Sequence, residues 1–380
     1  MSDIVVELSH YVDNGYYLRT FEIIKARFQP HVLGKHQFKI LGDPNKNQAN
    51  TDILSREHPV RKDGGIFIFP SVHFYLSEYR KFQQTNELLY DATSIDELTS
   101  FLSIGNDKDT TKPLDGGFPK GRCTAFIGCR GGHKSHLAYL HVLARLTKQY
   151  PGGSTNRQED AALIVSLRDD EMMIQNTLTG ILQNEFENNN KNIKEDYIEA
   201  GKLEILYYPP GYISPEEFIN RIFVSIHKLK QKAKNVTVIF NSLDQLAARF
   251  PLCAKLDIFI PSIIQILIGE SVTSIFVAVD EKDQPAEQYG LLPMADLILS
   301  FHQYRIDEAQ YKDIIEPDVT HSTTSNKRDH IIITVERFAG GKKGGSKGLL
   351  EYHTDSNKRK TMKFSPLLDN VYLNKSQFKK

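Results

Sequence analysis

Short apolar runs alternate with helix-like stretches through most of this 380-residue chain after residue 123. Five such runs lie at residues 161–167, 203–208, 236–240, 274–279 and 296–301. Stretches suited to helices separate most of them, as at residues 215–233 and 256–268. Strands that are apolar on both faces and alternate with helices indicate a mostly parallel sheet covered by helices on both sides. We therefore expect an α/β protein.

A glycine-rich turn follows one further apolar run and stands directly before a helix. The run is Cys123–Gly128, and from His136 onward leucines recur at helical spacing. The turn between them contains Gly128, Gly131, Gly132, His133, Lys134 and Ser135. A strand, a glycine-rich turn that ends in Lys-Ser, and a helix are the layout of a phosphate-binding loop, whose consensus is G-x-x-x-x-G-K-S/T. His133 stands where the last glycine of that consensus belongs.

Each part of such a loop has a physical task. Successive backbone N–H groups point at the phosphates, the lysine neutralises their charge, and the hydroxyl ligates a magnesium ion. The positive end of the following helix dipole favours the same anion. The residues expected to bind the phosphates are Gly128, Gly131, Gly132, His133, Lys134, Ser135 and His136. The alternative is a strand-to-helix turn with a solvated lysine and no ligand.

Composition narrows the class of protein. With 40% hydrophobic and 25% charged residues, the chain is typical of globular proteins. No uninterrupted apolar segment reaches the roughly 18 residues that a bilayer span needs, and the first ten residues lack the basic and apolar regions of a secretory signal. The cysteines Cys123, Cys129 and Cys253 have no metal-ligand spacing and fit a reducing compartment. We expect a cytoplasmic protein that does not bind a membrane.

Charge is balanced overall but not along the chain. Lysine plus arginine equal aspartate plus glutamate at 47 each, whereas residues 321–380 hold 13 basic against 5 acidic side chains. Such a basic end fits contact with a phosphate backbone or an acidic neighbour. A solvated tail that only aids solubility explains it equally well.

The chain divides into three parts by its local patterns. Residues 1–110 combine a strand at Gly65–Phe69, an Asn-rich stretch and a helix near residues 77–85, and we interpret them as a small α+β accessory domain. Residues 105–113 read as a linker. Residues 111–355 form the expected nucleotide-binding domain, which ends in a hairpin of residues 330–337 and 348–353. Residues 356–380 are a basic C-terminal segment.

Five segments in one order resemble the RecA-like ATPases, in particular the KaiC-type proteins and the DnaB-type replicative helicases. Leu-Asp-Gly-Gly-Phe-Pro-Lys-Gly at residues 114–121 looks like their lead-in to the phosphate loop, and residues 200–218 resemble the KaiC-type approach to the next helix. Residues 238–246 resemble the Walker B strand, and Ala-Asp-Leu-Ile-Leu at 295–299 resembles a later core strand. Residues 331–338 and their return strand look like the closing hairpin. The resemblance covers residues 114–355.

The resemblance implies a RecA-like fold, ATP and Mg²⁺ as ligands, and roles for particular residues. Ser135, with Asn241 or Asp244, would hold the magnesium ion. Asp169 would stand where KaiC-type proteins carry a second carboxylate, and Asp169 or the adjacent Asp170 is the candidate general base. RecA-like sites lie between subunits, so Arg337 or Lys342 of a neighbouring chain would stabilise the transition state. The assembly implied is a homo-oligomeric ring, expected to be a hexamer.

Three departures from the family pattern weaken the expected chemistry. Arg168 occupies the place of the glutamate that polarises the attacking water, and the neutral Asn241 replaces the Walker B aspartate. His133 adds a side chain where the loop backbone approaches the phosphates. Because phosphoryl transfer depends on positioning and charge stabilisation, the loss of a general base costs on the order of a hundredfold or more in rate. Nucleotide binding is expected to remain intact, with slow or absent hydrolysis.

Two other functions remain open on the sequence. The basic C-terminal end and the Lys342-Lys343 turn fit a DNA-transacting motor of the helicase or recombinase type. The weakened catalytic positions fit a non-enzymatic scaffold that is locked by nucleotide and recruits a protein through residues 1–110. Stimulation of ATP turnover by DNA would favour the motor, and capture of a partner by the first domain would favour the scaffold.

Overall fold

The computed structural model describes most of the chain. The described residues are 3–13, 16–41, 65–79, 89–93, 95–102, 116–147, 160–186, 191–208, 213–280, 286–306, 328–338, 345–354 and 360–367. The Asn-rich stretch, the expected linker at residues 105–113, Lys342 and Lys343 lie outside them. The chain forms two compact units: Met1–Phe82 with Tyr212–Phe223, called unit 1, and Gln83–Gly211 with Val224–Lys380, called unit 2. The division into domains at residues 110 and 355 stays a prediction.

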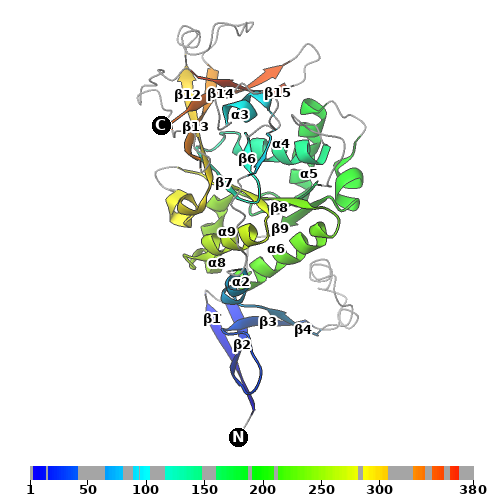
Figure 1. The fold of residues 1–380 in the computed structure, drawn as a ribbon, viewed down its shortest axis with the longest axis vertical. Coiled ribbons are helices and arrows are strands. Elements are labelled where there is room, and N and C mark those ends of the chain that lie inside the picture. Colours follow the sequence, from blue (N-terminus) through cyan, green and yellow to red (C-terminus); the bar gives the residue numbers. More distant parts are fainter. Residues whose placement is uncertain are drawn as a thin grey trace. The chain divides into compact units, whose positions relative to one another are not determined.

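Unit 1 contains a four-stranded antiparallel sheet in the order β1-β2-β3-β4 (Figure 1). Its strands are β1 (Ile4–Asp13), β2 (Tyr16–Ala26), β3 (His36–Leu41) and β4 (Gly65–Phe69). The helix α2 (Val72–Tyr79) follows β4. The strand at Gly65–Phe69 is confirmed, whereas the helix expected near residues 77–85 begins five residues earlier. The residues of that expected helix after Tyr79 lie outside the description.

Unit 2 is built around a nine-stranded sheet in the order β15-β14-β13-β12-β7-β11-β10-β8-β9. The strands from β12 to β9 in this order are parallel to one another, and β13, β14 and β15 extend the sheet in antiparallel fashion. The parallel strands are β7 (Cys123–Gly128), β8 (Asp160–Ser166), β9 (Leu203–Tyr207), β10 (Asn235–Asn241), β11 (Thr273–Val277) and β12 (Leu297–Ile306). The extension consists of β13 (Arg328–Phe338), β14 (Lys347–Thr354) and β15 (Lys360–Pro366).

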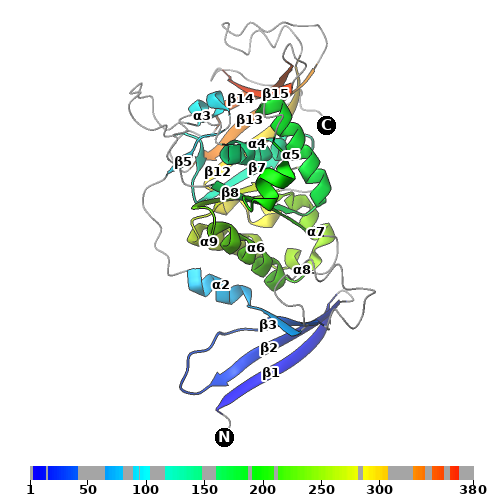
Figure 2. The same ribbon diagram turned by 90° about the vertical axis from the view of Figure 1, so that its right-hand side faces the viewer.

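Helices lie on both faces of this sheet, as Figure 2 shows for α4 and α5 on one side and α9 on the other. Besides α2, the α-helices of the described residues are α3 (Asp96–Phe101), α4 (Lys134–Thr147), α5 (Glu171–Glu185), α6 (Pro215–Lys230), α7 (Leu246–Arg249), α8 (Pro251–Ala254) and α9 (Phe259–Gly269). A π-helix, η1 (Ile193–Glu199), and the 3-10 helices η2 (Leu243–Gln245), η3 (Ala286–Tyr289) and η4 (Leu292–Met294) join them. A short pair, β5 (Tyr90–Asp91) and β6 (Phe118–Pro119), precedes β7.

The expected architecture is confirmed at the level of a mixed α/β fold with a large, mostly parallel central sheet flanked by helices. The closing hairpin is confirmed too, because β13 pairs antiparallel with β14. The strand β15 lies within residues 356–380, for which the sequence analysis gave a basic segment and no strand. Among the described residues, no helix has the length and apolar content that a membrane crossing requires.

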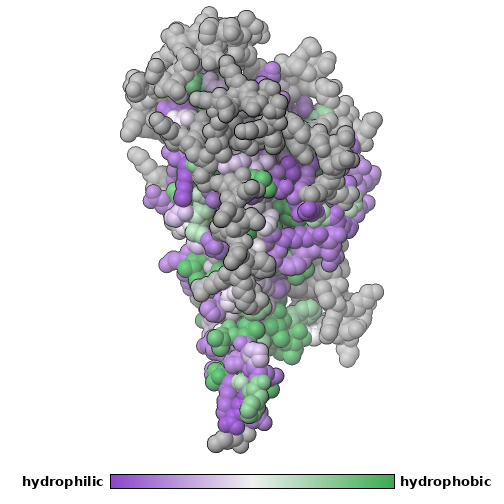
Figure 3. Space-filling view, viewed as in Figure 1, coloured by the Kyte–Doolittle hydropathy of each residue, from purple (hydrophilic) through white to green (hydrophobic). Residues whose placement is uncertain are grey.

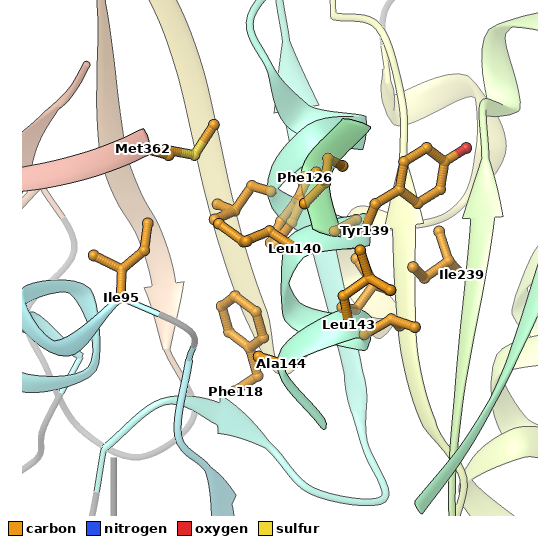
Figure 4. Close-up of a cluster of buried hydrophobic side chains, with 14 of the residues drawn as sticks. Ile95, Phe118, Phe126, Tyr139, Leu140, Leu143, Ala144, Ile239 and Met362 are labelled. Atoms are coloured by element: carbon orange, nitrogen blue, oxygen red, sulfur yellow. The ribbon is translucent and has the colours of Figure 1, made fainter. Parts of the chain in front are cut away.

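The core of unit 2 holds α4 against the sheet (Figure 4). Leu140, Leu143 and Ala144 of α4 are buried with Phe126 of β7 and Ile239 of β10. Burial of such aliphatic side chains contributes about 1.5–3 kcal/mol each. Because α4 begins directly after the glycine-rich turn, this packing fixes the end of the helix that the turn leads into.

An ion-pair network anchors the other end of α4. The guanidinium of Arg145 lies 3.0 Å from the Asp91 carboxylate and 3.1 Å from that of Asp160, at the start of β8. All three side chains are less than 10% exposed, so removal of one partner would leave a buried charge uncompensated. The helix is therefore held at both ends.

Candidate functional site

Three loops meet at the carboxyl edge of the parallel strands. They follow Gly128 of β7, Ser166 of β8 and Asn241 of β10. Asn241 lies beside Ser166 in register, and the backbone N–H of Leu167 donates to the Asn241 carbonyl at 2.8 Å. Ligands of open α/β sheets bind at this edge. The structure thus brings the residues expected from three separate motifs to one place.

Gly128 ends β7 where no other residue fits. Its φ is +131°, and a Cβ at this position would lie 2.1 Å from the Phe301 carbonyl oxygen of β12. Gly131, at φ +75°, has open space where its Cβ would be. Glycine adopts such angles without the penalty that a side chain brings. The first glycine is thus needed for strand packing, while the second leaves the loop open to a ligand.

His133 has the backbone conformation of the glycine that it replaces. Its φ is +56°, in the left-handed region that disfavours a side chain. The ring lies outside the loop and meets Tyr352 of β14 edge to face at a centroid distance of 4.8 Å. Burial, and secondarily the nearby His136, lower the pKa of His133. The departure from the consensus therefore preserves the loop's backbone and places an uncharged imidazole beside it.

Lys134 turns back onto the loop instead of pointing into solvent. Its Nζ donates to the carbonyls of Gly128 at 3.0 Å and Cys129 at 2.5 Å, and the residue is only 6% exposed. A buried ammonium group is costly unless hydrogen bonds compensate for its lost hydration. The positive charge of Lys134 is thus held against the backbone of the turn. The first turn of α4, which begins at this residue, adds N–H groups that have no acceptor within the helix.

Ser135 and Asn241 are in direct contact. The Ser135 hydroxyl donates to Asn241 Oδ1 at 2.7 Å, and Asn241 Nδ2 donates to the Tyr139 hydroxyl at 2.7 Å. Asn241 is 1% exposed, so the amide is shielded from water and its donor and acceptor both have protein partners. Burial raises the pKa of Tyr139, which keeps its phenol neutral. The structure joins two expected magnesium ligands and adds Tyr139, which we had not expected.

The third expected ligand, Asp244, lies in the same loop as Asn241 but binds other partners. One carboxylate oxygen accepts from the Ser242 hydroxyl, and the other accepts from Gln245 Nε2 at 2.8 Å. The residue is buried within η2. Among the described residues, no group of three or more His, Cys, Asp or Glu side chains could hold a metal ion. Ser135 and Asn241 supply neutral oxygen atoms, which magnesium accepts.

The candidate general base, Asp169, forms an ion pair with the adjacent Arg168. Arg168 donates from Nε to Asp169 Oδ1 at 2.9 Å and from Nη2 to Oδ2 at 3.0 Å. The hydrogen bonds to Asp169 raise the pKa of Arg168, so the guanidinium stays charged. The next carboxylate, Asp170, caps α5 by accepting from the Met173 backbone N–H at 2.8 Å. Both carboxylates that could orient a water molecule therefore hold structural partners.

Arg249 of α7 donates hydrogen bonds to the backbone of the Arg168 loop. Its Nη1 donates to the carbonyls of Leu167 and Arg168, each at 3.0 Å. Nothing in the sequence singled out Arg249, since it lies 81 positions from the loop. The sequence could have indicated Tyr139, because this residue follows Ser135 by four positions and so lies on the same face of a helix.

His136 belongs to a second small cluster beside the loop. Its ring meets Tyr352 at a centroid distance of 5.2 Å, and its Nε2 lies 3.7 Å from Glu185 Oε1. The same carboxylate of α5 accepts the backbone N–H of Met362 in β15 at 2.8 Å. His136 therefore faces a tyrosine and a carboxylate, and we had expected neither contact.

The expected residue Arg337 lies apart from this edge within one chain. It pairs with Ile298 of β12, which in turn pairs with Ala125, three residues before the end of β7. Its Nη1 donates to the Pro293 carbonyl at 3.2 Å. Its expected role at the site of a neighbouring chain stays a prediction. In comparisons with known proteins, no family model and no curated sequence matched this chain.

Proposed function

We propose that this chain is a RecA-like ATP-binding protein whose phosphate site is the loop from Gly128 to His136. The observation that carries the proposal is the 2.7 Å hydrogen bond from Ser135 to Asn241. It joins the last residue of the phosphate-loop pattern to the residue at the Walker B position, although 106 positions separate them. A strand-to-helix turn with no ligand gives no reason for this pairing.

The arrangement of strands supports the RecA-like assignment. The loop after β7, the Arg168 loop after β8 and the Asn241 loop after β10 open on the same edge of the sheet. The pairing of β12 with β7 and the antiparallel hairpin of β13 and β14 are compatible with the resemblance. The arrangement of these loops at one edge of the sheet supports the proposal.

The residues present fit a polyphosphate and a divalent ion. Gly131 leaves an open cradle, Lys134 supplies a buried positive charge, and the start of α4 offers N–H donors and a favourable dipole. Ser135 and Asn241 present the oxygen atoms for Mg²⁺, which when bound would neutralise charge on the phosphates. Because Asn241 carries no negative charge, the ion's protein ligands are weaker than an aspartate would make them.

The same geometry supports slow or absent hydrolysis. Arg168 stands at the position that the resemblance gives to the water-polarising glutamate, and two of its N–H groups bind the carboxylate of Asp169, one of the two that could substitute for it. Asp170 is committed to capping α5. A protein that binds ATP and keeps it is better suited to a nucleotide-locked assembly than to a motor. We therefore favour the scaffold over the helicase-like alternative, with the ring and its partner still to be found.

Calorimetry with ATP and magnesium tests this proposal. The parent chain is expected to bind, and Lys134→Ala to weaken binding by at least about tenfold, since one charge-assisted contact is worth 1.5–3 kcal/mol. Lys202→Ala, a change outside the loop, is the matched control and should bind like the parent. No heat at millimolar nucleotide, or equal affinity of Lys134→Ala and the parent, would contradict the proposal. Circular dichroism of each variant confirms that it is folded.

A further inference from the structure

Arg168 projects from a loop whose backbone is held by hydrogen bonds from two sides. On one side, the backbone N–H of Leu167 donates to the carbonyl of Asn241 at 2.8 Å. On the other side, Arg249 donates to the carbonyls of Leu167 and Arg168, each at 3.0 Å. A side chain on such a backbone meets a ligand without the entropic cost of ordering a loop. The loop is therefore suited to position the guanidinium of Arg168.

The guanidinium lies near the side chains that join the phosphate loop to β10. Hydrogen bonds to Asp169 raise the pKa of Arg168 most, and Tyr139 adds to that rise, which places its phenol close to the guanidinium. The Tyr139 hydroxyl accepts a hydrogen bond from Asn241, and Asn241 accepts one from Ser135 of the loop. A charged and partly exposed group thus stands beside the expected magnesium ligands.

The ion pair with Asp169 leaves Arg168 able to bind a further anion. Asp169 is held by Nε and Nη2, so the second terminal nitrogen, Nη1, is outside the pair. The two side chains are 52% and 20% exposed, and a pair this exposed contributes little to stability. Arginine binds phosphate oxygens through charge-assisted hydrogen bonds that are stronger than those of neutral donors. A phosphate group therefore has a donor in Arg168 that the carboxylate does not occupy.

The order of the loops along the sheet edge assigns Arg168 to one particular phosphate. The loop with Lys134 follows β7, Asn241 ends β10, and Arg168 follows β8, the neighbour of β10 on the side away from β7. A polyphosphate whose inner groups lie on the loop would extend past Asn241 toward β8. We propose that Arg168 binds the terminal phosphate of a nucleoside triphosphate, so that the site prefers ATP to ADP. This inference rests on the proposed ATP site.

Such a contact makes Arg168 a specificity-determining residue. ADP lacks the phosphate that Arg168 binds, so the contact stabilises only the triphosphate complex. A guanidinium neutralises phosphate charge, but it has no acceptor for the proton of an attacking water molecule. The replacement of a glutamate by Arg168 thus exchanges a group that would promote hydrolysis for one that retains the triphosphate.

Calorimetry of the full chain with magnesium and either ADP or the β,γ-imido analogue of ATP tests the proposal. The parent should bind the analogue at least about tenfold more tightly than ADP, since one charge-assisted contact is gained. Arg168→Ala should lower the affinity for the analogue to that for ADP, and it should change the affinity for ADP by less than about twofold. Arg168→Gln keeps a side chain of similar length without the charge and should lose the preference as well.

Lys228→Ala is the matched control, because it also removes the basic partner of an exposed ion pair. Lys228 lies 3.3 Å from Glu204, and the two side chains are 64% and 22% exposed. Lys228 belongs to α6, which lies on a hydrophilic part of the surface in Figure 3. Glu204 is at the start of β9, away from the carboxyl edge. The control should keep the parent's preference for the analogue.

The outcomes separate this inference from the ATP site itself. A parent that binds the analogue and ADP with affinities within about twofold of each other overturns the inference and leaves the ATP site standing. An equal loss of both affinities in Arg168→Ala and Arg168→Gln also overturns it, because a residue that only maintains the loop would give that result. No binding of either nucleotide by the parent overturns both proposals.

Discussion

Arg168 holds both carboxylate oxygens of Asp169, its direct neighbour in sequence, at 2.9 and 3.0 Å. Side chains adjacent in sequence seldom form a two-point ion pair, and this one lies on the loop between β8 and α5 where a hydrolase would hold its base. The guanidinium is half exposed, so the pair adds little to stability. Under the proposed function, the pair would instead affect hydrolysis, because Asp169 is bound to Arg168 and is not available to orient water.

Replacement of Arg168 by glutamate should therefore raise ATP turnover. Arg168→Glu introduces the residue type that RecA-like ATPases carry at the position it resembles, and it removes the partner of Asp169. We expect kcat to rise on the order of a hundredfold in a phosphate-release assay. Arg168→Gln is the control, since it releases Asp169 without supplying a carboxylate. If kcat rises equally in both variants, Asp169 is the base. If kcat rises in neither variant, the loop takes no part in hydrolysis.

The chain of hydrogen bonds from Ser135 to Tyr139 predicts a cost for losing one hydroxyl. Tyr139→Phe leaves the buried Asn241 Nδ2 without its acceptor, so the free energy of unfolding should fall by about 1–3 kcal/mol in urea. Tyr197→Phe is the matched control: within the described part of the chain, that buried hydroxyl has no hydrogen-bond partner. The control should change stability little. Equal losses in the two variants would show that the Asn241 contact is not what stabilises the site.

His133 predicts that nucleotide affinity depends on pH. Its pKa is lowered by burial and by His136, so protonation opposes the fold, and the stability linked to this residue is present above its unfolded pKa of about 6.5 and is lost as pH falls. A bound phosphate favours the protonated ring, so ATP should bind more tightly at about pH 6 than at pH 8. His133→Asn tolerates the same φ but does not titrate. Calorimetry at the two pH values should show a smaller difference in ATP affinity for that variant than for the parent. An equal difference in affinity would exclude His133 as the cause of the pH dependence.

Gly128 predicts a strict steric limit at the end of β7. Gly128→Ala forces a Cβ against the Phe301 carbonyl. The free energy of unfolding should fall by about 3 kcal/mol or more, which would be measured as a lower melting temperature. Gly180→Ala is the control, because Gly180 lies within α5 with nothing near its Cβ position. That change should stabilise the protein by up to about 1 kcal/mol. A Gly128→Ala protein as stable as the parent would mean that β7 and β12 are not this close.

Local patterns were enough to predict the parallel core. The runs at residues 161–167 and 236–240 became β8 and β10 within one residue at each end, since a strand buried on both faces is apolar throughout. The sheet of unit 1 was largely missed. Its strands mix apolar residues with polar ones such as His10 and Arg19 without a clear alternation, and long-range pairing rather than local pattern defines them.

The site was predictable where one short motif carries it. Gly128, Lys134 and Ser135 lie at the turn as expected, because their spacing follows from the loop's own geometry. Contacts made across the fold could not be inferred. Tyr352 comes from a strand more than 200 positions away, and Arg249 reaches the Arg168 loop through a helix with no motif. The ion pair of Arg168 with Asp169 also depends on a loop conformation that sequence spacing does not specify.

The contact of Tyr352 with both His133 and His136 couples the loop to the last strands of the sheet. Glu185 extends the coupling, since its carboxylate faces His136 and also receives the backbone N–H of Met362. If nucleotide binding moved either histidine ring, the change would act on β14 and β15. Thermodynamic reciprocity then requires that a molecule gripping those C-terminal strands alter affinity at the turn by the same factor in return. The far end of the chain is thus a place from which occupancy could be controlled.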